Sequence, residues 1–345
     1  MGIGLEVFEP LNGNIPDTKE IKRRRKHIEE IVINYPGFEQ ILKEIEDHHL
    51  LSTSSEESKG LFLKGEPGVG KSTLLKGYTK RYPSYREEGV KKVPVLYSKV
   101  PVGATPKSLA SSILLRLGDP VYDRGGENSL TDRLLQYIGK EMCAVELIII
   151  DEFQHLIDRD TDKVLKKASD WIKSFSEDAA VPILICGMPE SENIFERNAQ
   201  LDDRFSLREE MKSFEYESDE EKHLFRSFLH NLDKALPFSS RSKLADRLVS
   251  DKIYYATKGK QRMIKKILVE ATIIALKSGK DSIDEIDLYL AYRRINISSR
   301  KFAINPFTED SFYLPEEWEN EETRKRKSGE DGRNKDRGNR RWRNE

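Results

Sequence analysis

The feature that most constrains this chain is the glycine-rich segment Gly65-Glu-Pro-Gly-Val-Gly-Lys-Ser72. It fits the pattern G-x-x-x-x-G-K-[ST] at every position, and it lies between an apolar run at 60–64 and a helical pattern at 70–81. A strand, a glycine-rich turn and a helix in this order aim backbone N–H groups and the positive end of the helix at one anion. The segment therefore predicts a phosphate-binding loop in an α/β fold rather than a chance glycine-rich turn.

Each residue type in this loop has a task in holding a nucleoside triphosphate. The glycines let the backbone turn its N–H groups inward, toward the β-phosphate. Lys71 is expected to reach the β- and γ-phosphates, and Ser72 is expected to coordinate Mg²⁺. We therefore expect ATP and Mg²⁺ as cofactors, with a binding segment that comprises Gly65, Glu66, Pro67, Gly68, Val69, Gly70, Lys71, Ser72 and Thr73.

A loop of this kind also needs carboxylates, and residues 147–152 supply them. Four aliphatic residues precede Asp151 and Glu152. At the carboxyl end of a buried strand, Asp151 is expected to hold Mg²⁺ through water. Glu152 is expected to activate a water for attack on the γ-phosphate, because this proton transfer needs a carboxylate within hydrogen-bond reach. The structural alternative is an acidic turn after a core strand.

Strand-like apolar runs alternate with helical patterns as far as about residue 215. The apolar runs lie at 60–64, 93–97, 145–150 and 181–186, and the helical patterns at 70–81, 105–117, 129–142 and 161–176. This alternation predicts a parallel sheet flanked by helices. Beyond that point only helical patterns follow, at 218–236, 239–250, 260–277 and 282–293, which predicts a small all-helical domain.

The chain is expected to have four parts: an N-terminal helical extension at 1–52, an α/β core at 53–214, a helical lid at 215–295 and a C-terminal segment at 296–345. From residue 323 onward, 10 Lys and Arg stand against 4 Asp and Glu, a net charge of +6. This tail lacks the apolar surface that offsets ordering entropy, so we expect it to be disordered. It would bind nucleic acid or a protein partner, or only solubilise the chain. The aromatic segment 302–318 would dock back on the body or bind a partner.

Composition argues against several classes of protein. No apolar run approaches the roughly 18 residues that span a membrane, and the N-terminus lacks the basic-then-apolar pattern of a signal peptide. Cys143 and Cys186 cannot make a disulfide framework, and both lie in or beside apolar segments, which favours buried thiols in a reducing cytosol. None of the six histidines shares with a cysteine a spacing that is typical of zinc sites.

An Asp-Glu pair in this position, with a helical domain after the sheet, resembles the AAA+ ATPases. The resemblance implies a parallel five-stranded core with a helical lid, and three further site positions. Arg204 resembles the arginine finger that enters a neighbour's nucleotide site, with Arg197 in reserve, and Arg262 resembles the sensor 2 arginine of the lid. An ordinary surface arginine is the alternative for each. At sensor 1 the chain departs from the family, because residues 185–190 (Ile-Cys-Gly-Met-Pro-Glu) lack the usual Asn, Thr or Ser.

Four fragments resemble a narrower group, the TnsC/TniB regulators of Tn7-like transposition: residues 68–74, 102–118, 147–152 and 185–190. The resemblance covers roughly residues 30–295. It implies a bacterial cytoplasmic ATPase that polymerises on duplex target DNA and marks the insertion site. Such a protein bridges a TniQ/TnsD-type targeting protein to the transposase subunits TnsA and TnsB, and in some systems a CRISPR effector reads the target. Because Arg204 would come from a neighbour, the resemblance implies a head-to-tail ring or helical filament that hydrolysis dismantles.

Contact with DNA would need cations on the inner face of that assembly. Lys99, Thr105 and Lys107 have a loop-then-helix setting in which each could meet a backbone phosphate without reading sequence. For each lysine the alternative is a solvated surface residue. Two other functions stay open. A replication loader or initiator ATPase usually carries a helix-turn-helix domain after the lid, and residues 296–345 are too short and polar for one. A signalling nucleotide switch would act by protein contacts alone.

Overall fold

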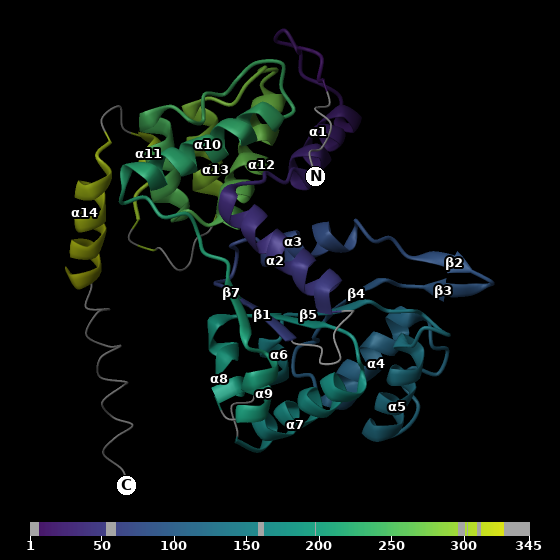
Figure 1. Ribbon diagram of the computed structural model, residues 1–345. Helices are drawn as coiled ribbons and strands as arrows, with labels where there is room; N and C mark the ends of the chain where they lie inside the picture. Colours follow the sequence, from purple (N-terminus) through teal and green to yellow (C-terminus); the bar gives the residue numbers. More distant parts are fainter. Residues whose placement is uncertain are drawn as a thin grey trace. The chain divides into compact units, whose positions relative to one another are not determined.

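The computed structural model describes residues 7–52, 60–157, 162–196, 198–295, 301, 303–308 and 312–327 (Figure 1). The chain forms two compact units. We call residues 34–212 the core unit, and residues 1–33 together with 213–345 the helical unit. Arg197, the reserve finger residue, lies outside the described residues.

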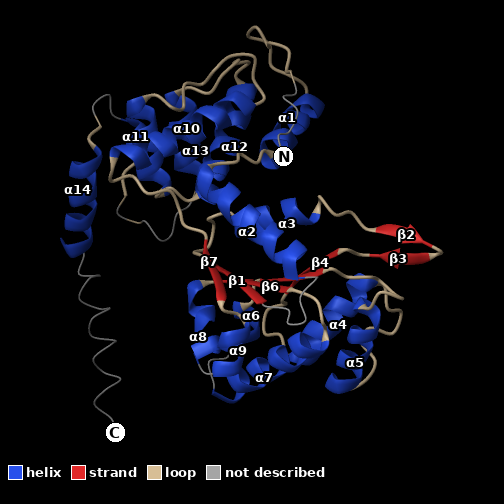
Figure 2. Cartoon of the chain, in the orientation of Figure 1, coloured by secondary structure: helices blue, strands red, loops and turns tan. Residues whose placement is uncertain are grey.

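The core unit is built on a five-stranded sheet in the order β4-β5-β6-β1-β7, with all pairs parallel, which confirms the predicted sheet (Figure 2). The strands are β1 (Gly60–Lys64), β4 (Val95–Lys99), β5 (Leu147–Asp151), β6 (Ile183–Gly187) and β7 (Leu207–Glu210). In β5, Ile148 and Ile150 point to one face while Ile149 is buried on the other, since side chains alternate along a strand. Helices on both faces explain why this strand is apolar throughout.

The helices of the core unit connect these strands. They are α2 (Pro36–Ser52), α3 (Lys71–Thr79), α4 (Pro106–Leu117), α5 (Glu127–Ile138), α6 (Gln154–Ile157), α7 (Asp162–Asp178), α8 (Asn193–Glu196) and α9 (Ala199–Arg204), with a 3-10 turn, η1 (Pro189–Glu192). Thr105 caps α4 in a capping box with Ser108, and Gly118 ends the helix at φ 98°. α4 begins within one residue of the predicted pattern and α5 ends four residues before the predicted end, whereas α6, α8 and α9 were not predicted.

A two-stranded hairpin of β2 (Tyr85–Glu87) and β3 (Val90–Lys92) projects from the core unit and is separate from the main sheet (Figure 1). The sequence patterns did not predict this hairpin. Its strands are three residues long and carry mostly charged side chains, so they lack the apolar alternation by which a strand is recognised.

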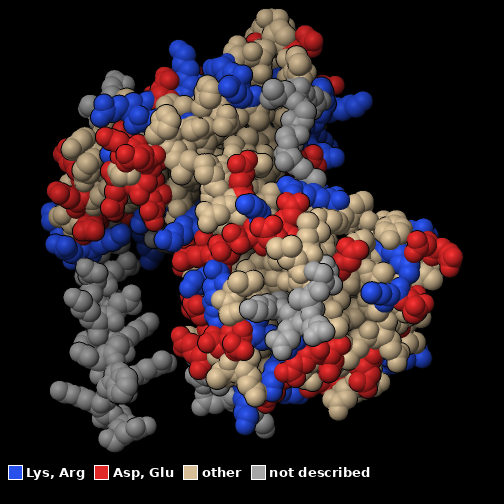
Figure 3. Space-filling model, in the orientation of Figure 1, with Lys and Arg blue, Asp and Glu red and all other residues tan. Residues whose placement is uncertain are grey.

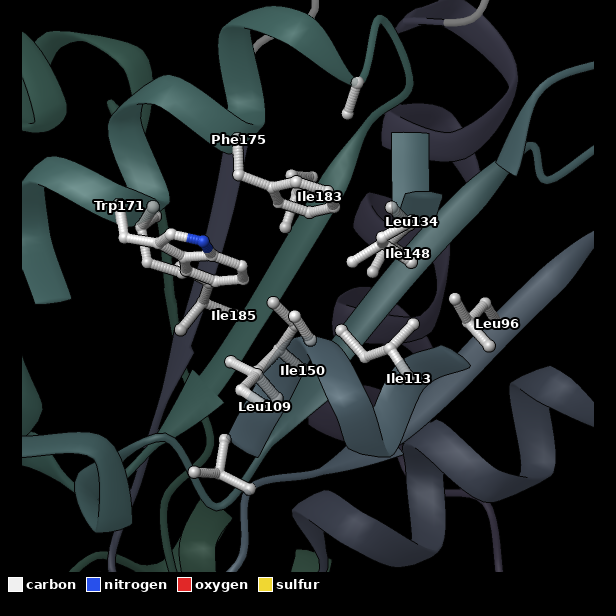
Figure 4. Close-up of a cluster of buried hydrophobic side chains, with 14 of the residues drawn as sticks. Leu96, Leu109, Ile113, Leu134, Ile148, Ile150, Trp171, Phe175, Ile183 and Ile185 are labelled. Atoms are coloured by element: carbon white, nitrogen blue, oxygen red, sulfur yellow. The ribbon is translucent and has the colours of Figure 1, made fainter. Parts of the chain in front are cut away.

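The hydrophobic core of this unit lies between the sheet and helices α4, α5 and α7 (Figure 4). Trp171 and Phe175, one helical turn apart on α7, stack with their ring centroids 5.1 Å apart. The other labelled side chains in the close-up are buried aliphatic residues from both layers, namely Leu96, Ile148, Ile150, Ile183 and Ile185 of the sheet and Leu109, Ile113 and Leu134 of the helices. This packing holds the carboxyl ends of the strands, and the loops that follow them, in place.

The helical unit contains α1 (Thr18–Glu30), α10 (Asp219–Ala235), α11 (Arg247–Thr257), α12 (Gln261–Lys277), α13 (Glu285–Arg294), η3 (Pro306–Thr308) and α14 (Leu314–Lys327). The first helix belongs here because the buried Arg24 donates to the carbonyls of Pro237 at 2.9 Å and Glu9 at 2.8 Å. The carboxylate of Asp281 accepts from the N–H groups of Leu11 and Asn12. None of the described helices is long and apolar enough to cross a bilayer.

One predicted helix is displaced. The pattern at 239–250 predicted a helix there, but α11 begins only at Arg247. The carboxylate of Asp233 accepts from the N–H groups of Ser242 and Lys243, and Lys243 adopts φ 57°. These bonds fix a turn, so the helix starts after it.

The C-terminal segment docks back on the helical unit. Phe312 and Trp318 pack against Tyr255 at centroid distances of 5.5 and 4.9 Å, and Lys258 Nζ lies 5.1 Å from the centre of the Trp318 ring. Helix α14 is acidic in its first turn and basic in its last, visible as separate red and blue areas (Figure 3). Because α14 reaches Lys327, the expectation of disorder from residue 323 is wrong for residues 323–327, and the rest of the tail lies outside the described residues.

Candidate nucleotide-binding site

The glycine-rich loop lies between β1 and α3, as the sequence predicted. Gly68 and Gly70 adopt φ 91° and 108°, a left-handed conformation that favours glycine. A Cβ at Gly65 would collide with the carbonyl oxygen of Met211, where the chain leaves β7, so this position also requires glycine. Val69 is fully buried and anchors the loop to the core. These residue types therefore allow the backbone conformation that the loop adopts.

The polar residues of the loop stand at the start of α3. The ammonium of Lys71 donates to the carbonyl of Gly65 and, at 3.1 Å, to that of Glu66. Lys71 and Ser72 are half-buried in the first turn, whereas Glu66, Pro67 and Thr73 are exposed. The positive charge of Lys71 therefore lies directly over a loop whose backbone and helix terminus both favour an anion.

Asp151 ends β5 as a buried carboxylate, 1% exposed. Its Oδ2 accepts from the hydroxyl of Tyr97 at 2.6 Å and its Oδ1 accepts from the N–H of Glu152 at 2.8 Å. Burial and this bond to Asp151 raise the pKa of Tyr97, so Tyr97 stays a neutral donor. The two bonds fix the carboxylate in one orientation at the edge of the sheet.

Glu152, the next residue, has a left-handed backbone with φ 60°, which is strained for a residue with a side chain. Its Oε1 lies 3.7 Å from Lys99 Nζ at the end of the neighbouring strand. Its Oε2 accepts from Gln154 Nε2 at 2.6 Å. About a third of the Glu152 side chain is exposed.

The structure brings Lys71, Asp151 and Glu152 to one edge of the sheet, because β1 and β5 flank β6 and all three strands run parallel. The charges of Asp151 and Lys71 both affect the pKa of the Cys186 thiol on β6. Burial raises its pKa most, the charge of Asp151 raises it further, and the charge of Lys71 lowers it. A cation, a candidate Mg²⁺ ligand and a candidate base therefore share this edge.

The remaining predicted residues have other settings. Arg204 ends α9 and donates from Nη2 to the carbonyl of Ser176 at 2.6 Å, so within this chain it is bound to its own core unit. Arg262 is exposed in the first turn of α12 in the helical unit. Lys107 is exposed in the first turn of α4, and Thr105 caps that helix. Lys99, predicted as a DNA contact, is the residue that faces Glu152.

Two residues of the site were not predicted. Tyr97 points from β4 to Asp151, and Gln154 bonds to Glu152 from the start of α6. Neither belongs to a recognisable motif. Only the pairing of β4 with β5, in which Lys99 lies opposite Asp151, reveals the role of Tyr97. The sole signal for Gln154 was its position two residues after the acidic pair.

Among the described residues, no cluster of three or more His, Cys, Asp or Glu is placed to hold a metal ion. Mg²⁺ that is bound with a nucleotide takes only one or two protein ligands and completes its coordination with phosphate and water. Ser72 and Asp151 would be those ligands. The residues present therefore suit Mg²⁺ and a triphosphate.

This sheet order, with the glycine-rich loop after β1, the acidic pair after β5 and a helical unit that follows, defines a P-loop NTPase fold of the AAA+ class. Cdc6p from Pyrobaculum aerophilum is similar in structure, with a TM-score of 0.58 at 15% identity over 77% of this chain and 69% of that one. The ORC1 protein of Aeropyrum pernix in complex with DNA has a TM-score of 0.57 at 15% identity over 79% and 69%. The ORC2 protein of Aeropyrum pernix, in ADPNP-ADP complexes, has a TM-score of 0.56 at 16% identity over 80% and 73%.

Sequence comparison narrows the class. The family described as bacterial TniB protein matches residues 23–215, more than half of the chain, and the chain belongs to this family. No curated protein matches it. The predicted resemblance to TniB-type AAA+ regulators is thereby confirmed.

Proposed function

We propose that this chain is an ATP-dependent, DNA-binding regulator of transposition, which assembles on duplex target DNA and hydrolyses ATP to leave it. The observation that carries the proposal is the convergence of Lys71, Asp151 and Glu152 at one sheet edge in a chain of the TniB family. In this role it marks an insertion site and bridges a TniQ/TnsD-type targeting protein to the transposase subunits TnsA and TnsB.

The chemistry follows from the placed side chains. Backbone N–H groups at Gly68 and Gly70, with the ammonium of Lys71, bind the phosphates and offset their charge. Held by Ser72 and Asp151, Mg²⁺ would supply further neutralisation of the phosphate charge. Glu152 accepts the proton of the attacking water, since its side chain, about a third exposed beside the buried Asp151, can reach solvent.

The proposed assembly and its DNA contacts involve the other predicted site residues, most of which are Lys or Arg. A neighbour would supply Arg204 to the nucleotide, which makes each site incomplete in one chain and requires head-to-tail contacts, whether in a ring or a filament. Arg262 would approach the same nucleotide from the lid. Lys99, Thr105 and Lys107, at and after the end of β4, would bind backbone phosphates of the duplex.

A second candidate is a replication loader or initiator ATPase, which the fold likeness to ORC1 and Cdc6p favours. At 15% identity that likeness concerns the fold, whereas the family match concerns this chain's own sequence. A pull-down separates the two. A transposition regulator retains a TniQ-type protein and TnsB on DNA in the presence of ATP, whereas a loader retains a replicative helicase.

The test of the proposal is assembly on a DNA duplex with ATP, followed by electron microscopy and by sedimentation. Lys71→Ala is expected to abolish assembly, because it removes the cation that holds the triphosphate. Glu152→Gln is expected to assemble as the wild type does and to disassemble more slowly. Equal assembly of the wild type and Lys71→Ala would refute the proposal. Wild-type binding to DNA that depends on neither nucleotide nor salt concentration would refute it as well.

A further inference from the structure

β6 ends at Cys186 and Gly187, where the resemblance to AAA+ proteins implied Asn, Thr or Ser, and the side chain of Gln154 reaches the turn that follows. Gln154 lies at the start of α6. Its Oε1 accepts from the backbone N–H of Met188 at 3.3 Å, and its Nε2 donates to Glu152 Oε2 at 2.6 Å. One side chain therefore connects the turn after β6 to the candidate base.

This bridge has a chemical reason to be an amide. The carboxylate of Glu152 only accepts hydrogen bonds, and the N–H of Met188 only donates them. A primary amide carries a donor and an acceptor on the same group, and only one of its two orientations satisfies both partners. The network thus fixes the orientation of the Gln154 amide and, through it, that of the Glu152 carboxylate.

The backbone that follows Glu152 is also attached to β6. The N–H of Phe153 donates to the carbonyl of Cys186 at 2.9 Å, so the segment after Glu152 is tied to β6. Glu152 itself is strained at φ 60°. Lys99 Nζ lies 3.7 Å from Glu152 Oε1, whereas Gln154 lies at hydrogen-bond distance from Oε2. The bond from Gln154 therefore favours one rotation of the carboxyl group.

We propose that Gln154 is a positioning residue for ATP hydrolysis. It orients the carboxylate of Glu152 toward the attacking water and takes the place of the polar side chain that the end of β6 lacks. The proposal rests on the hydrolytic role of Glu152 in the proposed function. Gln154, two positions after the acidic pair, would thus have a role that the acidic motif itself does not include.

A double-mutant cycle tests this. Gln154→Met keeps the length of the side chain and removes both hydrogen bonds. Single-turnover hydrolysis in the DNA-bound assembly is expected to fall by about tenfold to a hundredfold, with the KM for ATP and the assembly itself unchanged. In a Glu152→Gln background the same substitution is expected to cause no further loss, because residues that act as a unit are not additive. Gln136→Met, on an exposed glutamine of α5, is the matched control and is expected to keep the wild-type rate.

A wild-type rate in Gln154→Met would overturn the proposal, and so would a loss of equal size in both backgrounds, which indicates a merely structural role. If Gln154→Met melts below the assay temperature, Gln154→Glu replaces it in the cycle, with the same expectations, because an ionised carboxylate cannot donate to Glu152. The two proposals fail differently. A wild-type protein that does not hydrolyse ATP contradicts the proposed function, whereas an active wild type with unaffected Gln154 variants contradicts only this inference.

Discussion

The hydrogen bond from Tyr97 to Asp151 is open to a direct energetic test. Asp151 is 1% exposed; the Tyr97 hydroxyl donates to its Oδ2 at 2.6 Å, and the N–H of Glu152 donates to its Oδ1 at 2.8 Å. Tyr97→Phe removes this donor and leaves the ring in place. A hydrogen bond to a charged group contributes about 1.5–3 kcal/mol, so the free energy of unfolding of the metal-free protein is expected to fall by about 2 kcal/mol.

The measurement is urea unfolding near neutral pH in the presence of a chelator, followed by the fluorescence of Trp171, which lies in the core unit. Tyr85→Phe is the control, because Tyr85 is 51% exposed on the hairpin, and its loss is expected to cost less than about 0.5 kcal/mol. If Tyr97→Phe is as stable as Tyr85→Phe, the bond to Asp151 does not hold the site as argued.

The pH dependence adds a check of sign. The pKa of Tyr97 is raised in the folded chain, so its neutral form is favoured by folding. The resulting stability is fully present below the usual tyrosine pKa of about 10 and decreases as the pH rises above it. The difference between wild type and Tyr97→Phe should therefore be constant from neutral pH to about pH 9 and change only beyond that.

Two further predictions concern other parts of the core unit. Arg204→Ala subunits are expected to bind ATP but to hydrolyse it about 10³-fold or more slowly. Mixing them with Lys71→Ala subunits should restore turnover, because the Lys71→Ala subunits supply Arg204 to the intact nucleotide sites of their neighbours. If mixed assemblies show no recovery, Arg204 does not act on a neighbouring subunit. Burial lowers the pKa of His48 from 6.5 to about 4. As the pH falls below 6.5, His48 gains a proton in the unfolded chain but not in the folded chain, so folding becomes less favourable. Between pH 7.5 and pH 5 the wild type should lose about 2 kcal/mol of unfolding free energy that His48→Gln does not lose, as measured by urea unfolding at both pH values. Equal losses in the two proteins would show that His48 is not buried in its neutral form.

Where side chains repeat with a clear period, the sequence predicted the elements closely. β1 and α12 were placed within one residue, because a strand buried on both faces and a long amphipathic helix carry their signal locally. The start of α11 and the hairpin of β2 and β3 were not predicted. The first depends on a turn that Asp233 fixes from the end of α10, and the second on the pairing of two polar strands.

The site divides in the same way. The glycine-rich loop, Lys71 and the pair of Asp151 and Glu152 could be recognised from their own residues, since each motif is a continuous stretch. That Tyr97 holds Asp151, and that Gln154 links Glu152 to the turn after β6, became evident only in the folded chain. Tyr97 and Asp151 are 54 positions apart and Gln154 and Met188 are 34 apart, and a hydrogen bond forms only once packing has brought its donor and acceptor together.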